Sequence, residues 1–79
     1  MNLKIQFFGM IAELVGKEHL EIDSFEGSML QEVETYLLQE FPDLNKMTYT
    51  MSLNRQIVGG DSPLVQHNEI ALLPPFAGG

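Results

Sequence analysis

One segment limits the folds open to this chain more than any other: residues 28–41 form its single clear amphipathic helix. The apolar residues recur at helical spacing, and polar and acidic residues fill the other face; the apolar positions are Leu30, Val33, Leu37 and Phe41. Ser28, followed three residues later by Gln31, fits a capping box at the start. Pro42 disfavours helical geometry at the residue before it, so the helix should end near Glu40 or Phe41. One helix covers only one face of a sheet, so the remaining residues must supply a single layer beneath it.

Short stretches on both sides of this helix alternate between apolar and polar residues, which is typical of strands with one buried face. They are residues 3–8, 19–22 and 47–53, and a turn at Asn54-Arg55 leads to a short strand over residues 56–58. Residues 69–73 are nearly all apolar, which predicts a central strand buried on both faces. Before it, Asn68 is expected in a turn with left-handed backbone geometry. These patterns predict an α+β fold: a mixed sheet of four to five strands with one main helix packed across it.

Composition argues against several classes of function. The 79 residues, 44% of them apolar, make one small domain. The chain has no cysteine, so a disulfide, a zinc ribbon and a thiol nucleophile are excluded. A net charge of −7 with only four Lys and Arg argues against nucleic acid and favours a basic partner. The chain lacks a signal sequence and the ~20 apolar residues of a membrane span, so a cytoplasmic protein is expected.

No group of side chains in the sequence suggests a catalytic site within the domain. His19 and His67 lie in separate segments without ligand spacing, so we expect surface residues and no metal site. Gly59-Gly60 is followed by Asp61 rather than by a helix with a lysine, which favours a turn over a phosphate-binding loop. The domain is therefore not expected to be catalytic alone.

The end of the chain is unlike an ordinary frayed terminus. It reads Pro74, Pro75, Phe76, Ala77, Gly78, Gly79. The prolines end the last strand and favour an extended segment, and the phenylalanine supplies one bulky anchor. The glycines leave bare backbone, which fits a channel too narrow for a Cβ atom. We expect residues 1–73 to form the folded domain and residues 74–79 a flexible tail of at most ~20 Å that presents the terminal carboxylate.

A carboxylate resists nucleophilic attack because of its charge, so a reaction at Gly79 requires activation, typically adenylation with ATP by a separate enzyme. A sulfur donor would then leave a thiocarboxylate, whereas an amine would leave an amide. Because the chain has no cysteine, any sulfur that it carries must reside on this terminus. The residues alone leave three readings open: a sulfur carrier, a ubiquitin-like modifier conjugated through Gly79, and an interaction domain with an irrelevant tail.

Three stretches resemble the MoaD family, the small subunits of molybdopterin synthase, which are ubiquitin-like β-grasp sulfur carriers. They read FFGMIAELVG, SLNRQIV and DSPLVQHNEIALLPPFAGG, so the resemblance covers nearly the whole chain. A terminal diglycine is shared by many ubiquitin-like proteins, and the opening FF…ELVG together with LLPPFAGG is far more specific. The chain departs from the family at Gln66-His67-Asn68, where Asp-Gly-Asp is usual, and at Phe76, where valine is frequent.

The resemblance implies that an adenylyltransferase similar to ubiquitin-activating enzymes uses ATP to activate Gly79, and that a persulfide donor supplies the sulfur. The tail, residues 74–79, would insert into the large subunit of molybdopterin synthase, in an assembly of two small and two large subunits. There it would deliver sulfur to cyclic pyranopterin monophosphate in molybdenum cofactor biosynthesis, with no cofactor bound to this chain. An apolar surface beside the tail, including Phe8, is expected to contact partners. Carriers for thiamine thiazole or another thiolation pathway rank second.

Overall fold

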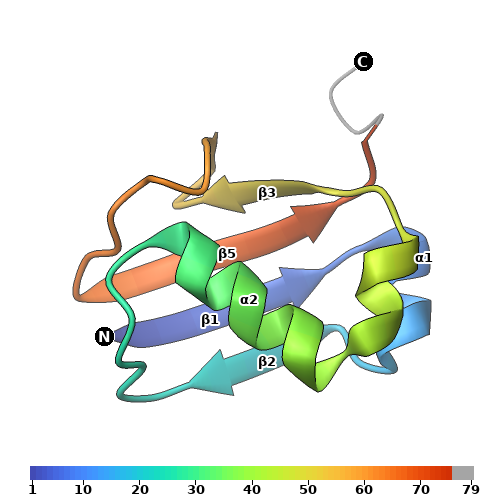
Figure 1. Ribbon diagram of the computed structural model, residues 1–79, viewed down its shortest axis with the longest axis horizontal. Helices are drawn as coiled ribbons and strands as arrows, with labels where there is room; N and C mark the ends of the chain where they lie inside the picture. The colour runs from blue at the N-terminus through green and yellow to red at the C-terminus, as the bar shows by residue number, and fades with distance from the viewer. Residues whose placement is uncertain (76–79) are drawn as a thin grey trace.

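The structure is a computed structural model that describes residues 1–75. Its elements are β1 (Asn2–Phe7), α1 (Gly9–Val15), β2 (His19–Ile22), α2 (Leu30–Glu40), the 3-10 helix η1 (Pro42–Lys46), β3 (Thr50–Leu53), β4 (Gln56–Ile57) and β5 (His67–Leu73). The strands form one sheet in the order β2-β1-β5-β3-β4. β1 and β5 are parallel, the other pairs are antiparallel, and α2 lies across one face (Figure 1). The predicted mixed sheet with one main helix is confirmed.

The core lies between α2 and the face of the sheet that the helix covers. Alternate residues of β1 point into it, so Leu3, Ile5 and Phe7 are buried while the residues between them are exposed. Helix α2 buries Leu30, Val33 and Leu37, three of the four apolar positions that the spacing predicted. The fourth, Phe41, is half-buried and packs edge-on against Phe7, with ring centroids 6.0 Å apart.

The prediction that β5 is buried on both faces is wrong. Asn68, Ile70 and Leu72 are buried, whereas Glu69 is exposed and Ala71 is half-buried. β5 is nevertheless a central strand, because it pairs with β1 on one side and β3 on the other. Its apolar run thus reflects its central place in the sheet. Within residues 1–75, no helix covers the second face of the sheet (Figure 1).

β3 is shorter than the alternation of residues 47–53 predicted. It begins at Thr50, which pairs with Leu73, the last residue of β5. The next residue of β5 would be Pro74, which has no N–H to extend the ladder. The proline that ends β5 therefore also limits where β3 begins.

The start of α2 is capped differently from the predicted box of Ser28 and Gln31. The N-cap is Met29, whose side chain makes no capping hydrogen bond. Instead, the Ser28 backbone N–H donates to Glu32 Oε1 at 3.2 Å. The side chain that bonds to Ser28 is therefore that of Glu32 and not that of Gln31, the predicted partner.

Two N–H groups of the first turn of this helix donate to carbonyls of the loop that precedes β5. Leu30 N–H donates to the Ser62 carbonyl at 2.9 Å, and Gln31 N–H donates to the Gly60 carbonyl at 2.8 Å. A Cβ atom on Gly60 would lie 3.0 Å from Gln31 Cβ, which explains a glycine at this position. The turn predicted at Gly59-Gly60 is present, and it caps the helix.

Two turns place β5 and β4. Asn54 and Arg55 both have positive φ, 51° and 72°, as a two-residue type I′ hairpin requires, so the turn type left open by the sequence is settled. The left-handed geometry predicted for Asn68 is wrong: this residue lies within β5 and is buried. Its side-chain amide accepts a hydrogen bond from Val65 N–H (2.9 Å) and donates to the carbonyls of Val65 (2.7 Å) and Asn2 (3.2 Å). The side chain closes the turn, so no residue there needs a left-handed backbone.

Candidate functional site

The predicted tail begins at the carboxyl end of β5, the central strand, close to the start of α1 (Figure 1). Pro74 is half-buried and Pro75 is exposed. The other tail residues singled out by the sequence, Phe76, Ala77, Gly78 and Gly79, lie outside the described residues. The structure therefore describes the base of the predicted tail and its surroundings.

Two contacts join this base to the start of α1. Phe8 N–H donates to the Leu72 carbonyl at 3.3 Å, which extends the pairing of β1 and β5 by one hydrogen bond. One residue further on, a Cβ atom on Gly9 would lie 3.5 Å from Pro74 Cγ, so the proline ring lies directly against this glycine. Gly9 has a φ of +58°, where glycine is free of steric cost.

Exposed apolar side chains flank the base of the tail on α1. Phe8, expected on a partner surface, is 43% exposed, and Met10 and Leu14 are 70% and 39% exposed. Met10 and Leu14 are four residues apart, so they share one side of the helix, while Ile11 is buried in the core. We call these three residues, Phe8, Met10 and Leu14, the α1 surface. The sequence prediction of a partner surface named Phe8 alone. The i, i+4 spacing of Met10 and Leu14 is the sequence pattern that could have placed these two residues on the same surface.

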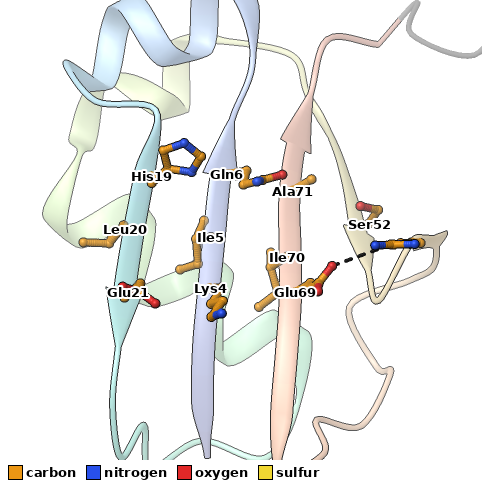
Figure 2. Close-up of a pocket in the computed structure, with 11 residues that line it drawn as sticks. Lys4, Ile5, Gln6, His19, Leu20, Glu21, Ser52, Glu69, Ile70 and Ala71 are labelled. Atoms are coloured by element: carbon orange, nitrogen blue, oxygen red, sulfur yellow. Dashed lines mark ion pairs between the residues drawn. The ribbon is translucent and has the colours of Figure 1, made fainter.

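The uncovered face of the sheet carries a row of charges of alternating sign. In the strand register, Lys4 of β1 lies between Glu21 of β2 and Glu69 of β5. Arg55 completes the row, with its Nε 3.7 Å from Glu69 Oε2 (Figure 2). The sequence does not predict this row, because the row depends on the register between strands that are distant in the chain.

The next row of the same face, toward the tail, contains no Asp, Glu, Lys or Arg. Gln6 is paired with His19 of β2 and Ala71 of β5, and Ala71 is paired with Ser52 of β3. Both rows line a hollow of about 720 Å³ (Figure 2). His19 lies on its rim as an exposed residue, as predicted, and His67 is also exposed. In the direction of the tail, the face therefore changes from a row of acidic and basic side chains to a row without carboxylates, lysine or arginine.

A partly buried hydrogen bond holds the segment opposite the base of the tail. Tyr49 precedes the residue that pairs with Leu73, and its hydroxyl donates to Glu34 Oε2 of α2 at 2.6 Å. Burial raises the pKa of the Tyr49 phenol, and the hydrogen bond and charge of Glu34 raise it further. The phenol thus stays protonated and joins the start of β3 to the helix.

Within residues 1–75, no three His, Asp or Glu side chains come close enough to hold a metal ion. No buried side-chain nitrogen or oxygen in that part of the chain lacks a hydrogen-bond partner. None of its helices has the length and apolar character needed to cross a membrane.

Comparison with known proteins gives full-length matches. A family model described as the ThiS family matches residues 5–79. A Caenorhabditis elegans protein named molybdopterin synthase sulfur carrier subunit is 35% identical, over 100% of this chain and 99% of that protein. An Arabidopsis thaliana protein of the same name is 32% identical, over 100% of this chain and 84% of that protein.

Solved structures with the same fold are similar over almost the whole chain. A Pyrococcus furiosus protein described as a candidate molybdopterin converting factor subunit 1 superposes with a TM-score of 0.85 at 16% identity, covering 95% of this chain and 98% of that one. Small archaeal modifier protein 1 of Haloferax volcanii gives 0.81 at 18% identity, with full coverage of both chains. At these identities, the two likenesses establish the β-grasp fold alone.

A third structure is a complex of subunits 1 and 2 of the molybdopterin-converting factor from Helicobacter pylori. One of its chains gives a TM-score of 0.70 at 28% identity, again with full coverage of both chains. In that complex, a chain with this fold is bound to a second subunit.

Proposed function

This chain belongs to the ThiS family, and on that premise we propose that it is the sulfur carrier subunit of molybdopterin synthase. Gly79 would be adenylated, converted to a thiocarboxylate and used to donate sulfur to cyclic pyranopterin monophosphate. The observation that carries the proposal is the end-to-end similarity to molybdopterin synthase sulfur carrier subunits, at 35% identity over 99% of the nematode protein. That name also favours the molybdopterin pathway over a thiazole or another thiolation pathway.

The position of the base of the tail supports this function. A carrier must present its last residue to other enzymes while the rest of the domain stays folded. β5 ends at Leu73, and Pro74 follows it at the margin of the sheet, beside the exposed α1 surface. We propose that Gly79 carries the sulfur, that Ala77 and Gly78 keep the approach narrow, and that Phe76 and the two prolines dock in the receiving enzyme.

The partners follow from the chemistry of the terminus. A carboxylate becomes reactive toward sulfur only as an activated acyl group, so an adenylyltransferase similar to ubiquitin-activating enzymes would use ATP for this step. The terminal sulfur of a persulfide donor would then displace AMP to give an acyl disulfide, and a second thiol would reduce that bond, releasing the thiocarboxylate and leaving a disulfide on the donor. The receiving enzyme would be the large synthase subunit, in an assembly of two small and two large subunits; the Helicobacter complex of subunits 1 and 2 supports a second subunit. This chain itself would bind no cofactor.

The test is reconstitution of the untagged chain with the adenylyltransferase, ATP, a persulfide donor and a thiol reductant, followed by addition of the large subunit and cyclic pyranopterin monophosphate. Intact-mass measurement should show the replacement of one oxygen by sulfur on the terminal residue, and the loaded protein should yield molybdopterin. Deletion of Gly79 should abolish both, and Gly78→Val should leave the fold intact while blocking loading or transfer. Molybdopterin synthesis by the Gly79 deletion would refute the proposal.

The same mass measurement on protein purified from cells tests the modifier alternative. A sulfur carrier gives a mass change confined to one atom, whereas conjugation through Gly79 gives large covalent adducts. Co-purification of the untagged chain tests the pathway, because a thiazole-forming partner in place of the large subunit would assign the sulfur to thiamine.

A further inference from the structure

We propose that the outer edge of β2 is a docking site for a second copy of this chain, whose own β2 pairs with it antiparallel and joins the two sheets into one. The inference goes beyond the proposed function and does not depend on it, because self-association is measured with this chain alone.

The first step is the backbone of β2. This strand ends the sheet, and within residues 1–75 it pairs only with β1. Phe7 N–H donates to the Glu18 carbonyl at 2.9 Å, which fixes the alternation of the pairing. The backbone of Leu20 therefore points at β1, whereas the N–H and C=O groups of His19 and Glu21 point outward. An outward row of this kind is a template for another strand.

The second step is the division of the β2 side chains between the two faces of the sheet. His19 and Glu21 are exposed and lie on the uncovered face, beside Gln6 and Lys4 (Figure 2). Leu20 and Ile22 are half-buried and pack against the core on the helix side. The core is thus incompletely covered at this edge. A strand placed alongside β2 would bury more of these two apolar side chains.

The third step is the register in which two copies of β2 fit. Outward-pointing residues must lie opposite each other, so a two-fold axis can pass at Leu20 only with His19 opposite the second copy's Glu21. In that register Leu20 faces its own copy on the helix side. On the other face, the imidazole of His19 can donate a hydrogen bond to the carboxylate of Glu21. Each copy therefore supplies the group that the other lacks.

The two neighbouring registers are less favourable. An axis at Glu21 places two carboxylates opposite each other, and like charges in that position are destabilising. An axis at His19 leaves only this one residue of β2 with a strand residue opposite it. The other edge of the sheet, β4, is only two residues long. Charge and strand length thus select the edge of β2 and the register centred on Leu20.

The pairing leaves the base of the tail accessible. β1 lies between β2 and β5, so the new strand is separated from the strand that carries Pro74. The two-fold axis reverses the strand direction, so the two tail bases lie at opposite ends of the joined sheet. The net charge of −7 opposes self-association. The dimer is therefore weak at low salt and becomes tighter as salt screens this repulsion.

Disulfide formation tests the register, because the chain has no cysteine of its own. Leu20→Cys should form an interchain disulfide about tenfold or more faster than Val65→Cys, an exposed position outside β2. Opposite residues of such a pair have Cα atoms ~4.5 Å apart, within disulfide range. His19→Cys and Glu21→Cys should each react slowly alone, since their copies lie roughly 7–8 Å apart on the diagonal, and rapidly when mixed.

The mixture keeps the test decisive if Leu20→Cys fails to fold, because His19 and Glu21 are exposed. Rates for Leu20→Cys and for the mixture that are no higher than the rate for Val65→Cys would overturn the proposal. That result is also expected if the edge of β2 binds a strand of a different protein instead of a second copy.

A proline substitution tests the use of the backbone. Glu21→Pro removes an N–H that points away from β1, and edge strands tolerate proline at such a position. It should raise the Kd of the dimer about tenfold or more, since an intermolecular hydrogen bond is lost from each copy. Glu21→Gln keeps the N–H and should change the Kd by less than about threefold. Circular dichroism should show the native fold in both variants, and equal Kd values would overturn backbone pairing.

Sedimentation equilibrium measures these Kd values at protein concentrations from about 10 µM to about 1 mM. The wild-type Kd should fall as salt is raised. A wild-type chain that stays monomeric over this whole range, at low and at high salt, would overturn the proposal. Sulfur loading of Gly79 is a separate measurement, so the proposed function stands or falls independently of this result.

Discussion

At the scale of single residues, exposure alone does not distinguish a binding residue from an incidental one. Phe8 and Val65 are exposed to similar extents, 43% and 52%, but they lie at opposite ends of the central strands. Phe8 is next to the base of the tail, whereas Val65 precedes β5. We expect Phe8→Ser to raise the Kd for the large subunit about tenfold or more, since buried aromatic side chains often carry much of the binding energy of an interface. Val65→Ser should change it less than twofold.

Isothermal titration with the large subunit measures both Kd values. Circular dichroism should show that both variants keep the native fold. Equal increases of Kd in the two variants would show that Phe8 contributes no more to binding than Val65. An unchanged Kd for Phe8→Ser would show that Phe8 does not contribute to the interface.

A second residue-scale prediction concerns Tyr49, whose pKa is raised above its ordinary value by burial and by Glu34. The folded state holds the phenolic proton more tightly than the unfolded state, so its stabilising effect is fully present below the unfolded pKa of about 10. It is lost as the pH rises through and above that value. Urea unfolding between pH 8 and 11 should therefore show a falling free energy of unfolding, with a shallower fall in Tyr49→Phe.

Tyr36→Phe is the control for this slope, because it leaves the hydrogen bond between Tyr49 and Glu34 in place. Near neutral pH, Tyr49→Phe should also cost about 1 kcal/mol through the lost hydrogen bond. If the free energy of unfolding falls equally steeply with pH in Tyr49→Phe and in the wild type, the pKa of this phenol does not differ between the folded and unfolded states.

At the scale of elements, periodic segments were predictable and their ends were not. The spacing of apolar residues within the 11 residues of α2 and the 6 residues of β1 is enough to predict both elements. The start of β3, the cap of α2 and the side chain that closes the turn at Asn68 depend instead on contacts with distant residues. The same holds for the candidate site: the tail is recognisable from its own residues, but the contact between Gly9 and Pro74 and the charged row require the register of β1 and β5.

The cap of α2 gives an element-scale prediction in which the sequence pattern and the structure disagree. If Ser28 were the N-cap, Ser28→Ala would cost about 1 kcal/mol. In the structure, the Ser28 hydroxyl donates one hydrogen bond, to Glu32 Oε1 at an exposed site. Ser28→Ala should therefore lower the free energy of unfolding by less than about 0.5 kcal/mol. Gly60→Val, which crowds Gln31 at the true cap, should cost about 1–3 kcal/mol. Thermal or urea unfolding of both variants measures these two losses of stability. A larger loss of stability for Ser28→Ala than for Gly60→Val would contradict the observed cap.

At the scale of the whole molecule, charge is the property most relevant to partners. The sequence has eleven acidic and four basic residues. In the part of the chain that the structure describes, two of the basic side chains form ion pairs, Lys46 with Asp43 and Arg55 with Glu69. The domain therefore attracts a basic surface from a distance, although its exposed apolar α1 surface lies near the base of the tail. Attraction of this kind acts mainly on the rate of association and weakens with salt.

The exposed pair of Lys46 and Asp43 on η1 provides a matched test of this attraction. Lys46→Gln and Asp43→Asn each remove the same ion pair, with 3.7 Å between Nζ and Oδ1, but they change the net charge from −7 in opposite directions, to −7 − 1 = −8 and −7 + 1 = −6. We expect the association rate constant with the large subunit to rise in Lys46→Gln and to fall in Asp43→Asn. Both differences should shrink as salt shortens the Debye length from ~30 Å at 0.01 M to ~3 Å at 1 M, with little change in the dissociation rate. Stopped-flow association measurements across that range test this, and equal changes of the same sign in both variants would show that the lost ion pair, and not the net charge, controls the rate.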